Sequence, residues 1–277
     1  MERGKMIVIE GTDCSGKETQ SNLLIQKLTE MGKDTVYFSF PYYKSSTGKI
    51  IGLCYLGKSY LGEQLIDDNI EEIKASIEGV DDETVNKVLD AVKKSLGKGW
   101  FQEGAPNVDM RVSSLYYAAD RLYNLPVIER YLSHGVNVVL DRYVYSNMGH
   151  QAGKCQTPEE RDEAFEWIGD LEFGKLHLPE PDAKIFLHMP TDYSVLLKQG
   201  RAEKADELER DTSHLRCAER AYCELAEKYG FETISCIRDT EGEISRDNIK
   251  TPEEINDEVF TYINKVVYKN GEKGHVM

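Results

Sequence analysis

The chain has 277 residues, and its 34 Lys and Arg against 49 Asp and Glu give it a formal charge of −15. A protein this acidic repels nucleic-acid backbones and anionic membranes unless a local basic patch opposes the effect, and the sequence shows no such patch. Hydrophobic residues make up 40% of the chain, which is enough for a sizeable core, but no apolar run is long enough to span a bilayer. We therefore expect neither nucleic acid nor a membrane among its partners.

The first apolar stretch, Met6 to Ile9, is too short for the core of a signal peptide and leads directly into a glycine-containing loop. The six cysteines include no CxxC pair and no Cys/His cluster with the spacing of a zinc site. We expect reduced thiols and a cytoplasmic location.

Short β-like runs alternate with longer helical patterns along the chain. Strands are expected over Met6–Glu10, Thr35–Phe40, Val136–Leu140, Ala183–Met189 and Glu232–Ile237. Helices are expected over Thr19–Met31, Val112–His134, Glu159–Leu171, Thr212–Tyr229 and Pro252–Val267. This alternation predicts an α/β fold with a five-stranded parallel sheet and helices on both faces.

Two regions are less regular. Residues 57–106 are charged and helix-prone, and we interpret them as an insertion of two helices within a single domain spanning residues 1–277. Residues 270–277 are expected to be frayed. The last helix has a clear start, because Thr251 is a good cap and Pro252 suits the first helical position.

The strongest motif lies between the first strand and the first helix. Gly11, Gly16 and Lys17 match the pattern GxxxxGK, in which glycines let the backbone N–H groups face a phosphate and Lys17 supplies charge to the β- and γ-phosphates. The following helix points its positive end at the same place. We expect an ATP site formed by Gly11, Thr12, Asp13, Cys14, Ser15, Gly16, Lys17, Glu18 and Thr19.

The residue after Lys17 departs from this motif, which has a Ser or Thr there to bind Mg²⁺. The chain has Glu18, with Thr19 one position late. An inward-pointing carboxylate would repel the phosphates by roughly 4 kcal/mol per charge pair at 4 Å. Asp141 follows the third strand, where it can hold Mg²⁺ through water or orient Arg142. The candidate metal ligands are therefore Asp141, Glu18 and Thr19, with Glu18 at most in the outer shell.

The chain lacks the NKxD motif of GTPases and the signature motif of ABC-type ATPases. It contains, in this order, IEGTDCSGKETQ, FPYYKSSTGK, SLYYAADR, LDRYVYSNMGHQ and LPEPDAKIFLHMP, and in these runs it resembles the thymidylate kinase family. The resemblance covers nearly the whole chain apart from 57–106. It implies a P-loop kinase fold, a homodimer, and transfer of the γ-phosphate of ATP to dTMP in the presence of Mg²⁺.

The resemblance also implies roles for individual residues. Asp13 would accept a hydrogen bond from the 3′-hydroxyl of the sugar, and the alternative is a turn residue bonded to its own backbone. Tyr117 would stack on thymine and Arg121 would contact its O4. The two share one helix face because they are four residues apart, although core packing is the alternative for the aromatic ring. Ser146 and Gln151 would lie near the base edge.

Other matching positions differ from the family. His150 replaces the usual Tyr or Phe beneath the sugar, where bulk disfavours a 2′-hydroxyl, so the discrimination between deoxyribose and ribose stays open. Lys44, next to Tyr43, is the cation nearest the position where the family has an Arg for the acceptor phosphate, and it would act as a point charge. Arg142 would neutralise donor and acceptor phosphates together, and a structural pair with Asp141 is the alternative.

Some family members place a catalytic Arg in the phosphate loop, at the position of Cys14, and others supply it from a lid. We assign this role to the charged segment 199–210, with Arg201 or Arg210 as the cation, against the alternative of a solvated surface. Two other functions stay open. One is a related kinase with another deoxynucleotide or a nucleoside as acceptor, and the other is a non-catalytic nucleotide-binding regulator, which Glu18 suggests.

Overall fold

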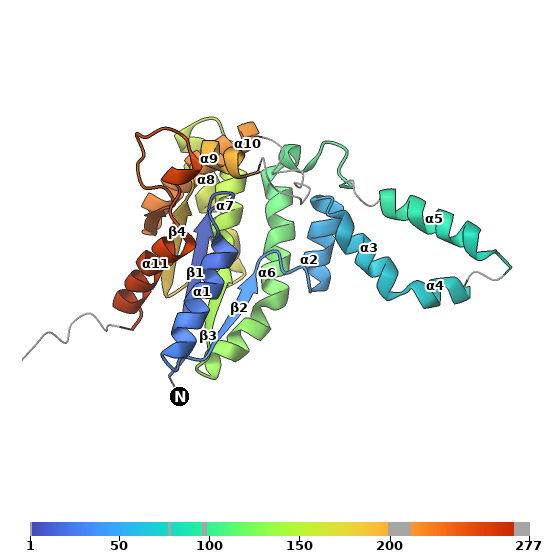
Figure 1. Cartoon of the computed structure of the whole chain (residues 1–277), viewed down its shortest axis with the longest axis horizontal. Coiled ribbons are helices and arrows are strands. Elements are labelled where there is room, and N and C mark those ends of the chain that lie inside the picture. Colours follow the sequence, from blue (N-terminus) through green and yellow to red (C-terminus); the bar gives the residue numbers. More distant parts are fainter. Residues whose placement is uncertain (1, 77–78, 96–98, 199–211, 269–277) are drawn as a thin grey trace, which may run out of the picture.

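The computed structural model describes residues 2–76, 79–95, 99–198 and 212–268. It contains a five-stranded sheet of β1 (Met6–Gly11), β2 (Thr35–Ser39), β3 (Asn137–Asp141), β4 (Ala183–His188) and β5 (Glu232–Ser235). The strand order is β2-β3-β1-β4-β5, and every neighbouring pair is parallel (Figure 1). The predicted α/β class, strand number and strand direction are confirmed.

Helices cover both faces of this sheet. They are α1 (Lys17–Glu30), α2 (Ser46–Ile50), α6 (Met110–Ser133), α7 (Val144–Ala152), α8 (Pro158–Gly169), α9 (Thr191–Lys198), α10 (Thr212–Lys228) and α11 (Pro252–Val266). The sequence patterns predict α1, α6, α8, α10 and α11 to within a few residues, but they miss the helix α9. The start of α11 is confirmed, since the Thr251 hydroxyl accepts from the Glu254 N–H and the Glu254 carboxylate accepts from the Thr251 N–H.

Strand β1 lies at the centre of the sheet and divides the core into two layers. Met6 and Val8 pack with residues of α6, α7, α8 and α10 on one face. Ile7 and Ile9 pack with residues of α1 and α11 on the other. All four side chains are fully buried, which explains why residues 6–9 of β1 form a continuous apolar run instead of alternating.

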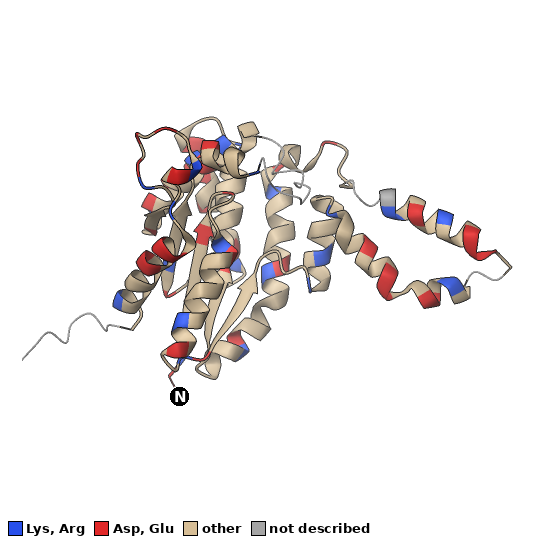
Figure 2. Ribbon diagram, in the orientation of Figure 1, with Lys and Arg blue, Asp and Glu red and all other residues tan. Residues whose placement is uncertain are grey.

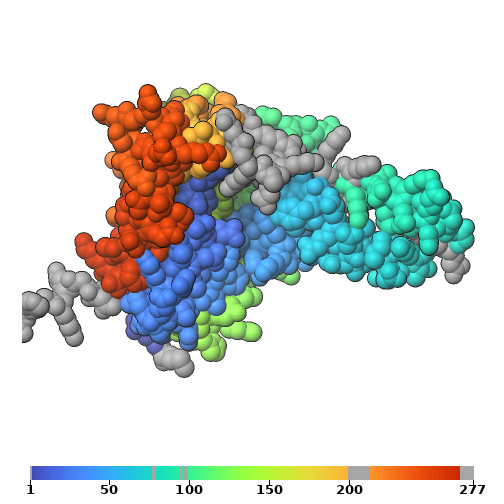
Figure 3. Space-filling model, viewed as in Figure 1, coloured from blue at the N-terminus to red at the C-terminus, as the bar shows by residue number. Residues whose placement is uncertain are grey.

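The segment between α2 and α6 forms an arm that extends away from the sheet (Figures 1 and 3). It contains the helices α3 (Ser59–Asp68), α4 (Ile70–Ser76) and α5 (Asp82–Ser95), so the expectation of two helices is wrong. The backbone leaves helical geometry at Asn69, with φ −115°, and this break separates α3 from α4. Figure 2 shows acidic and basic residues interspersed along the arm.

The base of the arm is attached to the rest of the molecule. The Trp100 N–H donates to the Cys54 carbonyl at 2.7 Å, so the two ends of the arm meet. The Tyr55 hydroxyl donates to the Ala105 carbonyl at 2.9 Å, and the Tyr55 ring packs edge-on against Phe101 with centroids 5.5 Å apart. This arrangement fixes the short π-helix η1 (Ile51–Tyr55) at the base of the arm.

None of the six cysteines forms a disulfide bond, as the sequence predicts. In the described ranges, no helix is long and apolar enough to cross a membrane. Because all five strands are parallel, the segments that follow β1, β2, β3 and β4 meet at one edge of the sheet. Most of the residues singled out by the sequence lie in these segments.

Candidate active site

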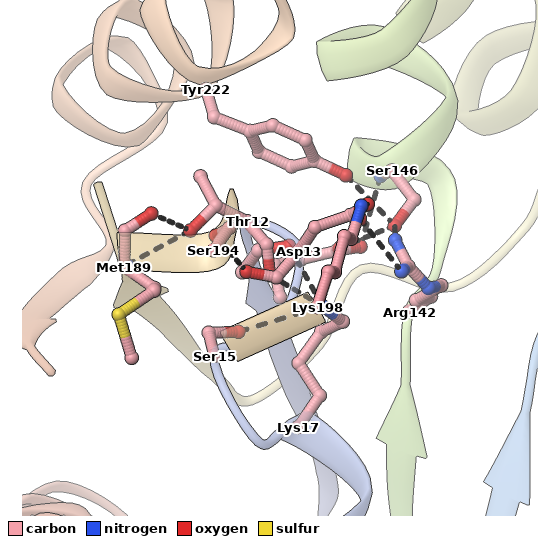
Figure 4. Close-up of polar contacts among 12 residues, drawn as sticks. Thr12, Asp13, Ser15, Lys17, Arg142, Ser146, Met189, Ser194, Lys198 and Tyr222 are labelled. Carbon is pink, nitrogen blue, oxygen red and sulfur yellow. Dashed lines mark hydrogen bonds and ion pairs between the residues drawn. The ribbon is translucent and has the colours of Figure 1, made fainter. Parts of the chain in front are cut away.

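Hydrogen bonds from the residue after β4 and from α9 fix the loop between β1 and α1 (Figure 4). The Thr12 hydroxyl donates to the Met189 carbonyl at 2.6 Å and accepts from the Met189 N–H at 2.9 Å. The Ser194 hydroxyl donates to the Asp13 carbonyl at 2.6 Å. Cys14 and Gly16 have φ values of 59° and 78°, and such left-handed residues turn backbone N–H groups towards one point. The loop is therefore shaped to receive an anion.

Lys17 crosses this loop instead of pointing to solvent. Its Nζ donates to the carbonyls of Gly11 at 3.0 Å and Thr12 at 2.8 Å, and the side chain is buried. Burial, assisted by the positive charge of Arg142, lowers the pKa of Lys17 to about 8. Lys17 is thus mostly protonated at neutral pH, and its charge lies within the phosphate loop.

Asp13 lies between two cations (Figure 4). Its Oδ2 is 2.9 Å from Lys198 Nζ, and its Oδ1 is 3.9 Å from Arg142 Nη2. Burial alone would raise the pKa of Asp13, but the charges of Arg142, Lys17 and Lys198 outweigh it and hold this pKa well below its usual range. The carboxylate therefore stays ionised beside a phosphate loop, because cations surround it.

The turn after β3 depends on a residue that the sequence patterns do not single out. Glu10, at the end of β1, is fully buried. Its Oε1 accepts from the N–H groups of Tyr143 at 2.7 Å and Ser146 at 2.9 Å, and its Oε2 accepts from the Ser146 hydroxyl at 2.5 Å. Burial raises the pKa of Glu10 to about 6. The only sequence signal for this role is an acidic residue at the end of an otherwise apolar strand.

The predicted metal ligands lie in different environments. Asp141 Oδ2 accepts from the Tyr37 hydroxyl at 3.2 Å, while the buried Oδ1 has no hydrogen-bond partner among the described residues. Glu18 lines the same cavity as Asp141. Thr19 is exposed on α1 and does not line that cavity, because it lies one position past the motif's hydroxyl.

A cavity of 520 Å³ opens at this edge of the sheet, a size typical of small-ligand sites. Nine residues predicted to bind the acceptor line it: Asp13, Tyr43, Lys44, Tyr117, Arg121, Arg142, Ser146, His150 and Gln151. The walls come from β2, from the segments after β1, β2 and β3, from Leu56, which follows η1, and from α6, α7 and α10. Lys58, at the start of the arm, also lines the cavity, with its Nζ 5.5 Å from the Tyr43 ring centroid, and the sequence patterns miss it.

Arg121 is fixed by an ion pair that the sequence does not predict. Its Nε and Nη2 donate to the Glu172 carboxylate at 2.5 and 2.6 Å, and its Nη1 donates to the Tyr143 carbonyl at 3.3 Å. Glu172 is fully buried and also accepts from the Asn147 amide at 3.1 Å. A guanidinium has five N–H groups, so two lie outside these three contacts. Arg121 therefore has a structural role in addition to any contact with a ligand.

The residues of α7 are also tied to the framework. The Ser146 hydroxyl is bonded to Glu10 and Tyr222, and the His150 ring stacks on His214 with centroids 5.7 Å apart. Burial and the neighbouring Arg142 lower the pKa of His150 well below its usual range, so the ring is neutral. The Gln151 Oε1 is buried and has no hydrogen-bond partner among the described residues.

The remaining sequence predictions concern Lys44, the partner of Arg142, and the cations of the segment 199–210. Lys44 is exposed at the rim of the cavity, and the Ser45 hydroxyl caps α2 by accepting from the Gly48 N–H at 3.1 Å. In the part of the chain that the structure describes, Arg142 forms its ion pair with Asp13 and not with Asp141. Asp141 instead accepts a hydrogen bond from Tyr37. Arg201 and Arg210 lie outside the described residues.

The parallel sheet, the phosphate loop at its centre and the adjoining cavity define a P-loop kinase. The family model "Thymidylate kinase" matches residues 9–66 and 101–246, which is more than half of the chain. The chain therefore belongs to the thymidylate kinase family. The unmatched stretch between these ranges covers most of the arm.

Individual relatives agree with this assignment. The chain is 26% identical over 233 residues to the thymidylate kinase of Schizosaccharomyces pombe, covering 84% of this chain and 83% of that protein. It is 25% identical over 223 residues to the thymidylate kinase of Danio rerio, covering 80% of this chain and 77% of that protein. A solved structure of thymidylate kinase from Candida albicans matches 95% of this chain and 92% of its own, with a TM-score of 0.59 and 19% identity. At that identity, the structural match supports the fold alone.

The buried pair predicts that Arg121→Ala lowers the free energy of unfolding by about 3–5 kcal/mol, because Glu172 is left in the interior without its partner. Arg111→Ala on the same helix is the matched control, since Arg111 pairs with Asp109 at the exposed surface and such pairs contribute about 0–1 kcal/mol. Denaturant unfolding of both variants measures the difference. Equal, small losses would contradict a structural role for Arg121.

Proposed function

We propose that this protein transfers the γ-phosphate of ATP to dTMP and forms ADP and dTDP. The observation that carries the proposal is the convergence, in one cavity, of the nine residues that match the acceptor positions of the family. The cavity meets the phosphate loop through Asp13 and Glu18, so an acceptor in it lies beside a donor held by the loop.

The chemistry of the cavity favours a pyrimidine nucleotide as acceptor. Tyr117 offers a ring for stacking. The Gln151 Oε1, which has no hydrogen-bond partner among the described residues, suits an N–H donor such as the imide of thymine. Arg142 and Lys44 offer positive charge for a phosphate. The ionised Asp13 would accept a hydrogen bond from the 3′-hydroxyl of the sugar, in addition to its ion pair with Lys198.

Transfer to the acceptor requires no nucleophilic side chain. The acceptor phosphate would attack the γ-phosphorus in line, and catalysis would come from positioning and from stabilising the charge on the transferring group. Lys17 and Arg142 would supply that stabilisation. Arg201 and Arg210 are retained as proposed sources of a further cation from the segment 199–210.

Magnesium fits the site through Asp141. Its buried Oδ1 has no partner among the described residues, and Mg²⁺ in kinases is held by one or two carboxylates together with phosphates and waters. Glu18 lines the same cavity and would act through a water. The ion would neutralise negative charge on the donor phosphates. No group of three His, Cys, Asp or Glu with metal-binding geometry occurs in the described part, so the phosphates would complete the coordination.

An acceptor panel tests the proposal. Purified protein with ATP and Mg²⁺ is given dTMP, dUMP, dCMP, dAMP, dGMP or thymidine, and both ADP and the phosphorylated product are measured. We expect the highest kcat/KM with dTMP and no turnover of thymidine, which has no phosphate for the cations to hold. Preference for another acceptor would support a related kinase, and no turnover with any acceptor would support a regulator.

We further propose a homodimer formed through α6. Exposed apolar residues recur along one side of this helix: Val112, Leu115, Tyr116, Leu122, Tyr123, Val127 and Tyr131. A stripe of this kind marks a surface that a second copy can cover, and family resemblance gives the same expectation.

Sedimentation analysis should show a dimer that the double variant Leu115→Glu/Tyr123→Glu converts to a monomer. The charge of each new carboxylate would have to be buried at the interface. Val88→Glu on the arm, where Val88 is also exposed, is the control and should stay dimeric. A monomeric wild type, or a double variant that still dimerises, would contradict this assignment of the interface.

A further inference from the structure

Glu10 is a buried carboxylate that the mechanism above does not use. It is the last residue before the phosphate loop. Among the described residues, its carboxylate accepts from the segment that follows β3: the N–H groups of Tyr143 and Ser146 and the Ser146 hydroxyl. Desolvating a carboxylate is costly, and three hydrogen bonds from one turn offset that cost while fixing the turn. Both carboxylate oxygens of Glu10 therefore bind the short segment after β3 that begins with Arg142.

The backbone of Arg142 depends on this contact. Its φ is 69°, a left-handed conformation that is strained for a residue with a side chain. The Arg142 N–H donates to the Ile9 carbonyl at 3.1 Å, and Glu10 holds the next N–H along the chain. Two consecutive residues of β1 therefore maintain the strained turn from which the Arg142 side chain starts.

The tip of the Arg142 side chain depends on Glu10 as well. Arg142 Nη1 donates to Ser146 Oγ at 3.5 Å, and the Tyr222 hydroxyl donates to the same oxygen at 3.0 Å. A serine hydroxyl has one donor and two acceptor positions. Its donor faces Glu10 and its two acceptor positions face Arg142 and Tyr222, so the hydroxyl is fully used. This arrangement exists only while Glu10 is an acceptor.

We infer that Glu10 is the positioning residue for Arg142: its carboxylate, acting through Tyr143 and Ser146, holds the guanidinium where it bridges the donor and acceptor phosphates. Glu10 itself contacts neither substrate. The inference rests on the proposed function, because it assigns Glu10 to the cation of that reaction. It deepens the mechanism by naming the group that preorganises Arg142 before the nucleotides bind.

Glu10→Gln tests this role, because it keeps the shape of the side chain but replaces one acceptor oxygen with a donor NH₂. If that NH₂ faces Ser146, the hydroxyl must release Arg142 or Tyr222. We expect kcat at saturating ATP and dTMP to fall roughly ten- to hundredfold, as misplaced catalytic groups cause, with both KM values nearly unchanged. The assay is run at pH 7, where Lys17, with a pKa of about 8, stays mostly protonated and the acceptor phosphate, with a second pKa of about 6, is mostly ionised.

A double-mutant cycle separates positioning from a purely structural role. In an Arg142→Ala background, Glu10→Gln should cause no further loss of kcat, because the group that it positions is absent. Its loss of stability in thermal unfolding should be the same in both backgrounds. If the two kcat losses multiply, or if Glu10→Gln lowers stability while kcat per folded molecule is unchanged, the inference is overturned.

Ser146→Ala provides the same cycle if Glu10→Gln does not fold, since it removes only the hydroxyl that joins Glu10 to Arg142. Its kcat loss should likewise disappear in the Arg142→Ala background, and multiplicative losses would overturn the inference. Different results would contradict the proposed function and the role of Glu10. A wild type without turnover of any acceptor would remove the proposed function and this role with it, whereas an active wild type with an additive cycle would remove only the role of Glu10.

Discussion

Burial of charge at the carboxyl edge of the sheet is the constraint on which the site depends. Lys17, Arg142, Asp13 and Glu10 lie close together, and an isolated charge in a protein interior is strongly unfavourable. Each of them is stabilised by hydrogen bonds or by an opposite charge. Lys17 donates to loop carbonyls, Asp13 lies between Lys198 and Arg142, and Glu10 accepts three hydrogen bonds. These contacts fix the directions of the side chains before a nucleotide is present.

This arrangement has a consequence for an acidic protein. A net charge of −15 repels nucleotides at long range, so the attraction must come from cations concentrated at short range. The cavity provides them in Lys44, Lys58, Arg121 and Arg142, with Lys17 beneath the adjacent loop. Arg121 is paired with Glu172, so we expect Lys44, Lys58 and Arg142 to supply most of the attraction within the cavity.

The fold was largely predictable from sequence because its determinants are local. Apolar runs of strand length, helical periodicity and the GxxxxGK spacing each lie within about twenty residues. The nine residues that the sequence predicts to bind the acceptor all line one cavity. The contacts that the sequence does not predict join distant parts of the chain. Glu10 meets Tyr143 across 133 residues, and Arg121 meets Glu172 across 51, so no local pattern marks either pair. The third helix of the arm escaped because a single non-helical residue, Asn69, separates α3 from α4.

The most direct test of the account compares catalysis with binding in Lys17→Ala. Lys17 would stabilise the charge that develops on the transferring phosphoryl group, and the acceptor cavity is lined by other residues. We predict that kcat with ATP and dTMP falls by roughly a hundredfold or more, while the Kd for dTMP measured by calorimetric titration is nearly unchanged. A variant with near-normal kcat, or one whose loss of activity follows an equal loss of dTMP affinity, would contradict the account.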